Sequence, residues 1–212
     1  MRLSALLGMV LGLAAIVLAW TRAADREHAA ARVAARSGAP ASPTSPTRPP
    51  TTTAAIGSAR AQSDLEALRA RDLLIPVPGV EAKDLQESFA DERSGHLHEA
   101  LDIPAPRRTP VLAADDGFVA KLFTSVRGGL TVYQFDPTRT WCYYYAHLDG
   151  YAPGLHEGMT LHRGAVIGFV GTTGNAPPQV PHLHFAILRL GPDKRWWEGT
   201  AVDPYPVWAS GS

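Results

Sequence analysis

The stretch PHLHFAI at residues 181–187 alternates polar and apolar side chains with the period of two that is typical of a half-buried strand. Its leucine, phenylalanine and isoleucine occupy every second position, so they share one face that can pack into a core. His182 and His184 then lie side by side on the other face. This stretch predicts a strand that presents two imidazoles away from the core.

Two other segments carry histidine beside suitable partners. His98 and Asp102 are four residues apart, a spacing that places both side chains on one face of a helix or a strand. In the segment 141–148, a period of two places Tyr143, Tyr145 and His147 on one face. A single His–Asp pair is more often a surface hydrogen bond than a ligand set, but three such segments together favour a metal site.

Composition limits the chemistry of that site. The chain has 212 residues, 45% hydrophobic content and a mean hydropathy of −0.07, as expected for one ordinary globular domain. Its zero formal net charge argues against a nucleic-acid-binding domain, so we expect no nucleic-acid partner. The single cysteine, Cys142, excludes a disulfide framework or a CxxC zinc site. Two imidazoles and one carboxylate match a catalytic zinc site that keeps a position open for water.

The N-terminus predicts export. Residues 4–20 contain no charge, and they are flanked by Arg2 and Arg22, with Trp20 where an interfacial aromatic belongs. Seventeen residues are short for a membrane span and slightly long for a signal peptide. We expect residues 1–22 to be an uncleaved membrane anchor, with a cleaved signal as the alternative. In both cases the rest of the chain lies outside the cytoplasm.

A linker is expected between this segment and the globular part. Residues 23–62 are rich in Ala and Arg and then in Pro, Thr and Ser, a composition that offers little surface to bury. Seven arginines against two acidic residues give residues 1–62 a charge of +5, which leaves −5 for residues 63–212. The sequence Ser-Asp-Leu-Glu at 63–66 resembles a capping box and predicts a short helix over 64–73.

Short apolar runs separated by Gly, Pro and Asp predict an all-β domain over 63–212, with its core at about 85–190. The spacing favours a compact antiparallel sheet or β-sandwich. The predicted strands are 111–113, 118–123, 130–135, 141–148, 165–170 and 182–188. The first two and the third and fourth are each expected to pair as hairpins. Glycines at 168, 171 and 174 are better explained by a tight turn than by a phosphate loop, because no Lys-Ser/Thr follows them.

The order of these motifs resembles the lysostaphin/LytM-type zinc metallopeptidases. The resemblance rests on H-x-x-x-D at 98–102, A-x-D-G-x-V in slightly shifted form at 114–119, Y-x-H-L at 145–148, I-G-x-V-G-x-T-G at 167–174 and H-L-H-F at 182–185. It covers roughly residues 85–190 and implies a compact antiparallel β-sandwich with zinc in a groove. It also implies substrates among the stem peptides and cross-links of bacterial peptidoglycan.

The resemblance implies roles for five residues. His98, Asp102 and His184 resemble the three zinc ligands, which implies one Zn²⁺ per chain. His147 and His182 resemble the non-ligand catalytic pair. Two departures from the family pattern do not remove a ligand: Ala100 replaces a usual glycine, and residues 177–181 replace a Ser/Thr-Gly-Pro segment.

We therefore expect a zinc-dependent metalloendopeptidase of the cell envelope, anchored to the cytoplasmic membrane, that cuts peptidoglycan peptides. One alternative is a non-catalytic wall-binding or hydrolase-activator protein of the same fold. A zinc carboxypeptidase or dipeptidase is another alternative. The sequence does not choose between His147 and His182 as the general base.

The remaining residues have simpler interpretations. We expect Cys142 to be buried, and His96 to lie at the groove rim because it does not have the four-residue spacing to Asp102. Tyr143 and Tyr145 can line a groove or pack under the sheet. Arg93 is a candidate partner of a substrate carboxylate.

Two further groups have a single expected role. Solvated positions are expected for the remaining histidines, which are His28, His156 and His162. Four C-terminal aromatic residues are expected to pack on the sheet, with a glycan-contacting platform as the alternative: Trp196, Trp197, Tyr205 and Trp208.

Overall fold

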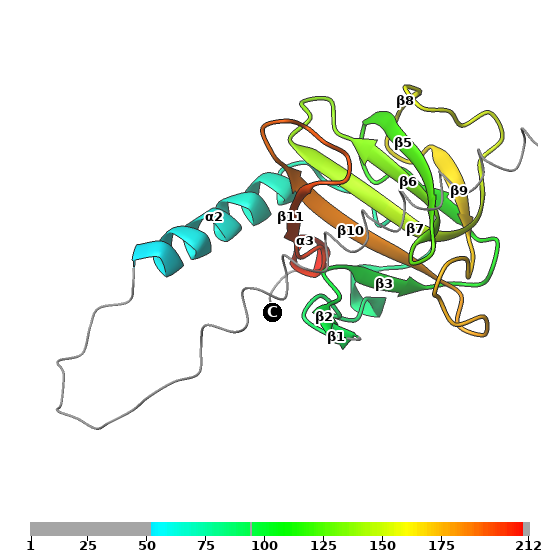
Figure 1. Cartoon of the computed structure of the whole chain (residues 1–212), viewed down its shortest axis with the longest axis horizontal. Helices are drawn as coiled ribbons and strands as arrows, with labels where there is room; N and C mark the ends of the chain where they lie inside the picture. The colour runs from blue at the N-terminus through cyan, green and yellow to red at the C-terminus, as the bar shows by residue number, and fades with distance from the viewer. Residues whose placement is uncertain (1–51, 94, 210–212) are drawn as a thin grey trace, which may run out of the picture. The chain divides into compact units, whose positions relative to one another are not determined.

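The computed structural model describes residues 52–93 and 95–209, which contain the predicted catalytic domain (Figure 1). The predicted anchor at 1–22 and most of the predicted linker lie outside these residues, as does His28. No helix in the described part of the chain is long and apolar enough to cross a membrane.

Strands dominate the described residues, and every strand pair is antiparallel. The strands are β1 (Glu92–Arg93), β2 (His96–Leu97), β3 (Leu101–Pro104), β4 (Pro110–Leu112), β5 (Gly117–Ser125), β6 (Gly129–Phe135), β7 (Trp141–Tyr151), β8 (Thr160–Leu161), β9 (Val166–Val170), β10 (His182–Leu190) and β11 (Gly199–Val202). All six predicted strands are present to within a few residues. The prediction of a mostly-β antiparallel domain is confirmed.

Nine of the strands form one sheet in the order β11-β10-β7-β6-β5-β8, with β3 added to β10, β9 to β7, and β4 to β9. Strands β1 and β2 form a separate two-stranded sheet. The sandwich prediction implied two sheets, whereas hydrogen bonding joins both sides of the core in one continuous sheet. Val111 of β4 and Ile167 of β9 share a core cluster with Phe185 of β10, so the β4–β9 pair covers the inner face of the sheet.

The predicted hairpin between 130–135 and 141–148 is confirmed as β6–β7. Its turn is held by Asp136, which is fully buried and accepts backbone hydrogen bonds from Thr138, Thr140 and Trp141 at 2.7–3.1 Å. A short acidic side chain that binds the backbone in this way is a typical turn former.

The other predicted hairpin is wrong. Strand β4 pairs with β9, more than fifty residues away, while β5 pairs with β6 and β8. The acidic turn between β4 and β5 points inward: Asp115 is buried and contacts Arg71 at 2.6 Å and the Tyr143 hydroxyl at 2.7 Å. These contacts fix the segment in the core, so the two strands separate.

The predicted helix over 64–73 is displaced. Helix α2 runs from Thr52 to Arg69, so it includes residues 52–62, which were assigned to the linker. Four alanines among residues 54–61 explain the earlier start, because alanine has the highest helix propensity. Ser63, the expected N-cap, therefore lies inside the helix, and the neighbouring Asp64 is buried and paired with Arg189.

Two short helices complete the described elements, and the C-terminal segment packs on the core. They are the 3-10 helix η1 (Ala82–Asp84) and helix α3 (Tyr205–Trp208). The Trp208 ring lies 5.7 Å from Phe185, and its Nε1 donates to the carbonyl of Leu73 at 2.7 Å. For Tyr205 and Trp208, the prediction that the C-terminal aromatic residues pack on the sheet is confirmed.

Candidate metal centre and catalytic site

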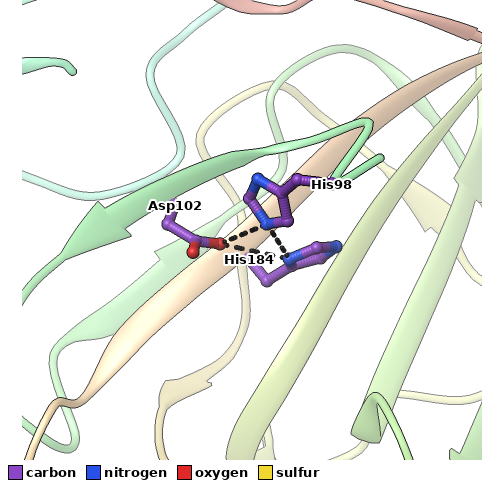
Figure 2. Close-up of side chains that lie close together, drawn as sticks. All are labelled: His98, Asp102 and His184. Atoms are coloured by element: carbon purple, nitrogen blue, oxygen red, sulfur yellow. Dashed lines mark hydrogen bonds and ion pairs between the residues drawn. The ribbon is translucent and has the colours of Figure 1, made fainter. Parts of the chain in front are cut away.

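Three predicted site residues meet at one point (Figure 2). Nε2 of His98 lies 3.0 Å from Oδ1 of Asp102 and 3.0 Å from Nδ1 of His184, and the last two atoms are 3.1 Å apart. These three side chains form the group among the described residues that could hold a metal ion. We call this group the His-Asp-His cluster.

Strand register explains how two members of the cluster meet. Asp102 of β3 and His184 of β10 are directly opposite each other across an antiparallel pair. Side chains in such pairs have Cβ atoms about 4.5–5.5 Å apart, so they can reach each other without a special backbone conformation. His98 precedes β3. The next residue, Glu99, has a φ of 55°, so the backbone turns between His98 and the strand.

Backbone hydrogen bonding fixes the protonation of the His98 ring. Its Nδ1 lies 3.0 Å from the carbonyl oxygen of Ser88, which can only accept, so in the neutral ring Nδ1 carries the proton. Nε2 then presents a lone pair to the cluster. When both rings are neutral, at most one proton, on Nδ1 of His184, lies between the three facing atoms. Such a group is suited to exchange that proton for a cation.

The cluster fits zinc in ligand type and in spacing. Two imidazole nitrogens and one carboxylate oxygen are a standard catalytic zinc set. Zinc bonds of about 2.0–2.1 Å in tetrahedral geometry place ligand atoms about 3.3 Å apart, close to the 3.0–3.1 Å observed here. The side chains of Asp102 and His184 are each 18% exposed and that of His98 is 4% exposed, so solvent reaches the cluster from the side of Asp102 and His184.

Arg93 lies against the cluster and contacts the second oxygen of its carboxylate. Nη1 of Arg93 donates to Oδ2 of Asp102 at 2.7 Å, and Nη2 lies 3.6 Å from Asp91. Burial raises the pKa of Asp102, but the contacts of its carboxylate with His184, His98 and Arg93 outweigh burial and hold the pKa far below its usual range. The carboxylate is therefore ionised. In the structure, Arg93 pairs with a protein carboxylate, and its pairing with a substrate carboxylate stays a prediction.

His147 and His182 lie next to the cluster. Their ring centroids are 5.0 Å apart, and His147 lies 5.5 Å from the His184 ring. Nε2 of His182 is 3.7 Å from Oδ1 of Asp102. The structure therefore brings all five predicted site residues together.

A backbone irregularity places His147 on this side of the sheet. The predicted alternation put it on one face with Tyr143 and Tyr145, but both tyrosines are fully buried in the core while His147 joins the cluster. The register of β6 and β7 shifts between Leu130 and Val132, and His147 has a φ of 60°. That conformation costs a non-glycine residue about 1–2 kcal/mol. The prediction of a shared face was wrong because one left-handed residue reverses the alternation.

Backbone carbonyls also hold both of these rings. Nδ1 of His147 contacts the carbonyl oxygen of Thr173 at 2.8 Å, and Nδ1 of His182 contacts that of Val180 at 2.8 Å. In each neutral ring Nδ1 carries the proton and Nε2 keeps its lone pair. Burial lowers the pKa of His147 to about 4, so this ring is neutral at neutral pH and can accept a proton.

The loop that carries Thr173 depends on the glycine segment noted in the sequence. Gly174 has a φ of 76°, and a Cβ there would lie 2.3 Å from the carbonyl oxygen of Arg127. A Cβ at Gly171 would lie 2.4 Å from the backbone nitrogen of Asp149. Close backbone approach therefore explains these two glycines, and the turn interpretation is confirmed for Gly174 but wrong for Gly168, which lies inside β9.

The remaining predictions near the site are mostly confirmed. His96, His156 and His162 are exposed and lie outside the cluster. Cys142 is fully buried, and burial raises the pKa of its thiol. Tyr144 is a neighbour of the site that residue patterns do not predict; its ring centroid lies 5.9 Å from that of His184.

Comparison with known families agrees with the geometry. The model of "Peptidase family M23" matches residues 96–204, just over half of the chain, and this range contains all five site residues. The chain belongs to peptidase family M23.

Curated M23 relatives are similar over the same region. The chain is 34% identical over 115 residues to the L-Ala--D-Glu endopeptidase of Bacillus subtilis (strain 168). The aligned region covers 52% of this chain and 34% of the relative. It is 37% identical over 93 residues to the DD-carboxypeptidase/endopeptidase Mpg of Neisseria meningitidis serogroup B (strain ATCC BAA-335 / MC58). Here the aligned region covers 42% of this chain and 19% of the relative. The chain thus spans about a third or less of the length of these relatives.

Solved M23-like structures share the fold. A putative glycyl-glycine endopeptidase lytM from Ruminococcus gnavus ATCC 29149 is similar with a TM-score of 0.56 and 30% identity, over 68% of this chain and 61% of that one. Lysostaphin from Staphylococcus simulans has a TM-score of 0.51 at 22% identity, over 65% and 53%. The second likeness concerns the fold alone.

Proposed function

We propose that this M23 protein is a zinc-dependent metalloendopeptidase that hydrolyses peptide bonds in the stem peptides or cross-links of bacterial peptidoglycan. The observation that carries the proposal is the convergence of His98, Asp102 and His184 within 3.0–3.1 Å, beside two further imidazoles. The three residues hold one zinc ion. His147 and His182 are the catalytic pair.

The reaction class follows from the chemistry of these groups. Lewis acidity toward a water molecule and a peptide carbonyl is what zinc supplies when it is bound. Nε2 of His147 and Nε2 of His182 hold lone pairs toward the same space, because each Nδ1 is bonded to a carbonyl. One ring accepts the proton of the attacking water and later donates it to the leaving amine. The other ring, once protonated, donates to the developing oxyanion.

The substrate class is supported by the relatives. The Bacillus subtilis relative is named an L-Ala--D-Glu endopeptidase and the Neisseria relative a DD-carboxypeptidase/endopeptidase. Both names refer to bonds that involve a D-amino acid, a type of residue that occurs in wall peptides. Residues 1–22 anchor the chain in the cytoplasmic membrane, and residues 23–51 connect this anchor to the domain outside the cytoplasm. Cleavage of residues 1–22 would instead release a secreted enzyme.

The test combines metal content with product analysis. The purified full-length chain is loaded with one equivalent of zinc and incubated with purified sacculi, with and without 1,10-phenanthroline. We expect soluble muropeptide fragments only without chelator, and chromatography of their new termini identifies the bond that is cut. His98→Ala should abolish release, whereas the exposed His96→Ala should not. Zinc-loaded protein that releases no fragment from any wall substrate would overturn the proposal.

The same experiment separates the alternatives. A non-catalytic wall-binding or activator protein would sediment with sacculi and release nothing by itself. A carboxypeptidase or dipeptidase would release free amino acids or dipeptides and leave cross-linked dimers intact. An endopeptidase converts dimers to monomers or separates stems from the glycan.

A further inference from the structure

A row of aromatic rings leads away from the metal centre. The Tyr144 ring centroid lies 5.9 Å from that of His184, Tyr133 lies 4.7 Å from Tyr144, and Trp196 lies 4.8 Å from Tyr133. Trp197 ends the row at 5.2 Å from Trp196. We call these four residues, Tyr144, Tyr133, Trp196 and Trp197, the aromatic row.

Strand register explains the first part of the row. Tyr133 of β6 and Tyr144 of β7 are directly opposite each other, and Tyr144 is opposite Ala186 of β10, two residues after His184. The three strands therefore present these side chains on the face that carries His184. Trp196 comes from the loop between β10 and β11 and packs on this face against Phe123 at 5.2 Å. The row is thus continuous with the metal centre on one face of the sheet.

The outer end of the row combines an exposed ring with hydrogen-bonding groups. Trp197 is 61% exposed. The Arg195 guanidinium lies 5.9 Å from its ring centroid and pairs with Asp193 at 3.1 Å and Glu198 at 3.6 Å. A surface cavity of about 110 Å³ is lined by residues 191–195 and 198, which include Arg195 but no member of the aromatic row. At about 30 Å³ per water molecule, this cavity has room for a small substituent such as an acetamido group.

We propose that the outer end of the aromatic row binds an N-acetylated amino-sugar ring of the glycan strand, while the attached peptide extends over Tyr133 and Tyr144 to the metal centre. This inference rests on the proposed function. The C–H face of a sugar ring stacks on an indole, and its hydroxyl and acetamido groups form hydrogen bonds with polar or charged side chains at the rim. Trp197 supplies the indole for stacking. Arg195, Asp193 and Glu198 supply the hydrogen-bonding groups at the rim.

A peptide side chain is the other occupant to consider. An extended peptide gains most of its affinity from main-chain hydrogen bonds at an open strand edge. The aromatic row instead lies on the face of β6 and β7, both of which are paired on two sides. A peptide over Tyr133 and Tyr144 is therefore held by its side chains, whereas the exposed Trp197 ring and its charged rim groups favour a sugar at the outer end.

Two measurements on the full-length chain test the inference. In the first, kcat/KM is compared between whole sacculi and sugar-free cross-linked peptides released by an amidase. We expect Trp197→Ala to lower kcat/KM about three- to tenfold more on sacculi than on the sugar-free peptides. Trp197→Phe should recover most of this difference. Val166→Ala removes an exposed apolar side chain on β9, outside the row, and should leave kcat/KM unchanged on both substrates.

In the second measurement, tryptophan fluorescence is recorded while chitotetraose, which carries no peptide, is added to the metal-free protein. We expect a saturable change that Trp197→Ala abolishes. Equal losses of kcat/KM on both substrates would indicate a peptide contact and overturn the inference. The absence of any loss, or of any response to chitotetraose, would overturn it as well. If zinc-loaded wild-type protein cuts neither substrate, the proposed function fails, and the fluorescence titration still decides whether sugar binds.

Discussion

The two faces of strands β7 and β10 differ in what they contact, although their residues alternate along the same chain. On the inner face, Tyr145 is fully buried, and its hydroxyl donates to Gln134 at 2.6 Å and accepts from the Ala114 nitrogen at 2.9 Å. The Phe185 ring packs 5.3 Å from Tyr145. In the described part of the chain, every buried side-chain nitrogen and oxygen atom has a hydrogen-bond partner.

The outer face of the same strands is open at the metal centre, whereas Cys142 and Leu190 on that face are buried in a second apolar cluster. Tyr144 and His184 are partly exposed. In the His-Asp-His cluster, the facing nitrogen and oxygen atoms have more lone pairs than hydrogens available to bond them. Near the metal centre, parity along the strand therefore separates side chains that stabilise the fold from side chains available for chemistry. His147 is the exception, because its left-handed backbone moves it from the inner series to the outer one. The comparison predicts that substitutions on the two faces have separable effects.

The largest effect is expected for Asp102→Ala on the outer face. Removal of the carboxylate leaves two imidazoles, so zinc should fall from one per chain to near zero and hydrolysis to background. His184→Ala should do the same. Zinc is measured by atomic emission after gel filtration, and digestion is measured on sacculi. His96→Ala is the matched control and should retain both properties. Full zinc stoichiometry in Asp102→Ala would refute its assignment as a ligand.

His147→Ala should separate catalysis from metal binding. The ring is outside the three-atom cluster, so zinc is retained, while loss of a proton-transfer group lowers kcat by about 10²- to 10⁴-fold. His182→Ala should behave in the same way. Parallel zinc and kcat measurements check this expectation, with the exposed His156→Ala as a control that changes neither. Loss of zinc in His147→Ala would show that this ring helps to hold the ion.

The inner face is tested through stability. Phe185→Ala removes a fully buried ring and should lower the free energy of unfolding by about 3–5 kcal/mol. Tyr144→Ala removes a half-buried ring from the outer face of the neighbouring strand, so it should lower the free energy of unfolding by less than half as much. Urea denaturation of the metal-free full-length chain measures both. Equal losses would mean that the outer face contributes to the core as much as the inner face does.

Much of this division was predictable from alternation alone. The period of two assigns His182 and His184 to one face of β10. The six strands predicted from the sequence begin and end within a few residues of the observed ones. It failed at β7, because nothing in the residue types around His147 signals a φ of 60°. It also failed at β4, because the partner of that strand is distant in sequence and its choice depends on the inward contacts of Asp115.

The site was predictable in its side chains and not in its supports. His98–Asp102 and His182–His184 have spacings that residue types reveal. The carbonyls that orient three of the imidazoles belong to Ser88, Thr173 and Val180. A backbone carbonyl is present at every position, so no residue type marks these three. The charge of Arg93 was noticed, but its partner depends on how β1 lies beside β3, which the sequence does not specify.

The smallest effect expected on the outer face concerns Arg93. It binds the oxygen of Asp102 that faces away from the two rings, so it fixes the carboxylate orientation without contacting the ion position. Loss of such a supporting hydrogen bond typically weakens metal affinity about 10- to 100-fold. Arg93→Ala should show this weakening in a zinc competition titration. Arg93→Lys should be intermediate, because an ammonium keeps the charge without the planar geometry.

The matched control for Arg93 is Arg107→Ala. Arg107 also pairs with an aspartate, Asp149, but that pair lies outside the His-Asp-His cluster, so its loss should leave zinc affinity unchanged. Equal zinc affinity in wild type and Arg93→Ala would mean that strand register alone orients Asp102. The outer face would then be organised by backbone pairing as completely as the inner one, and the difference between the faces would be reduced to exposure.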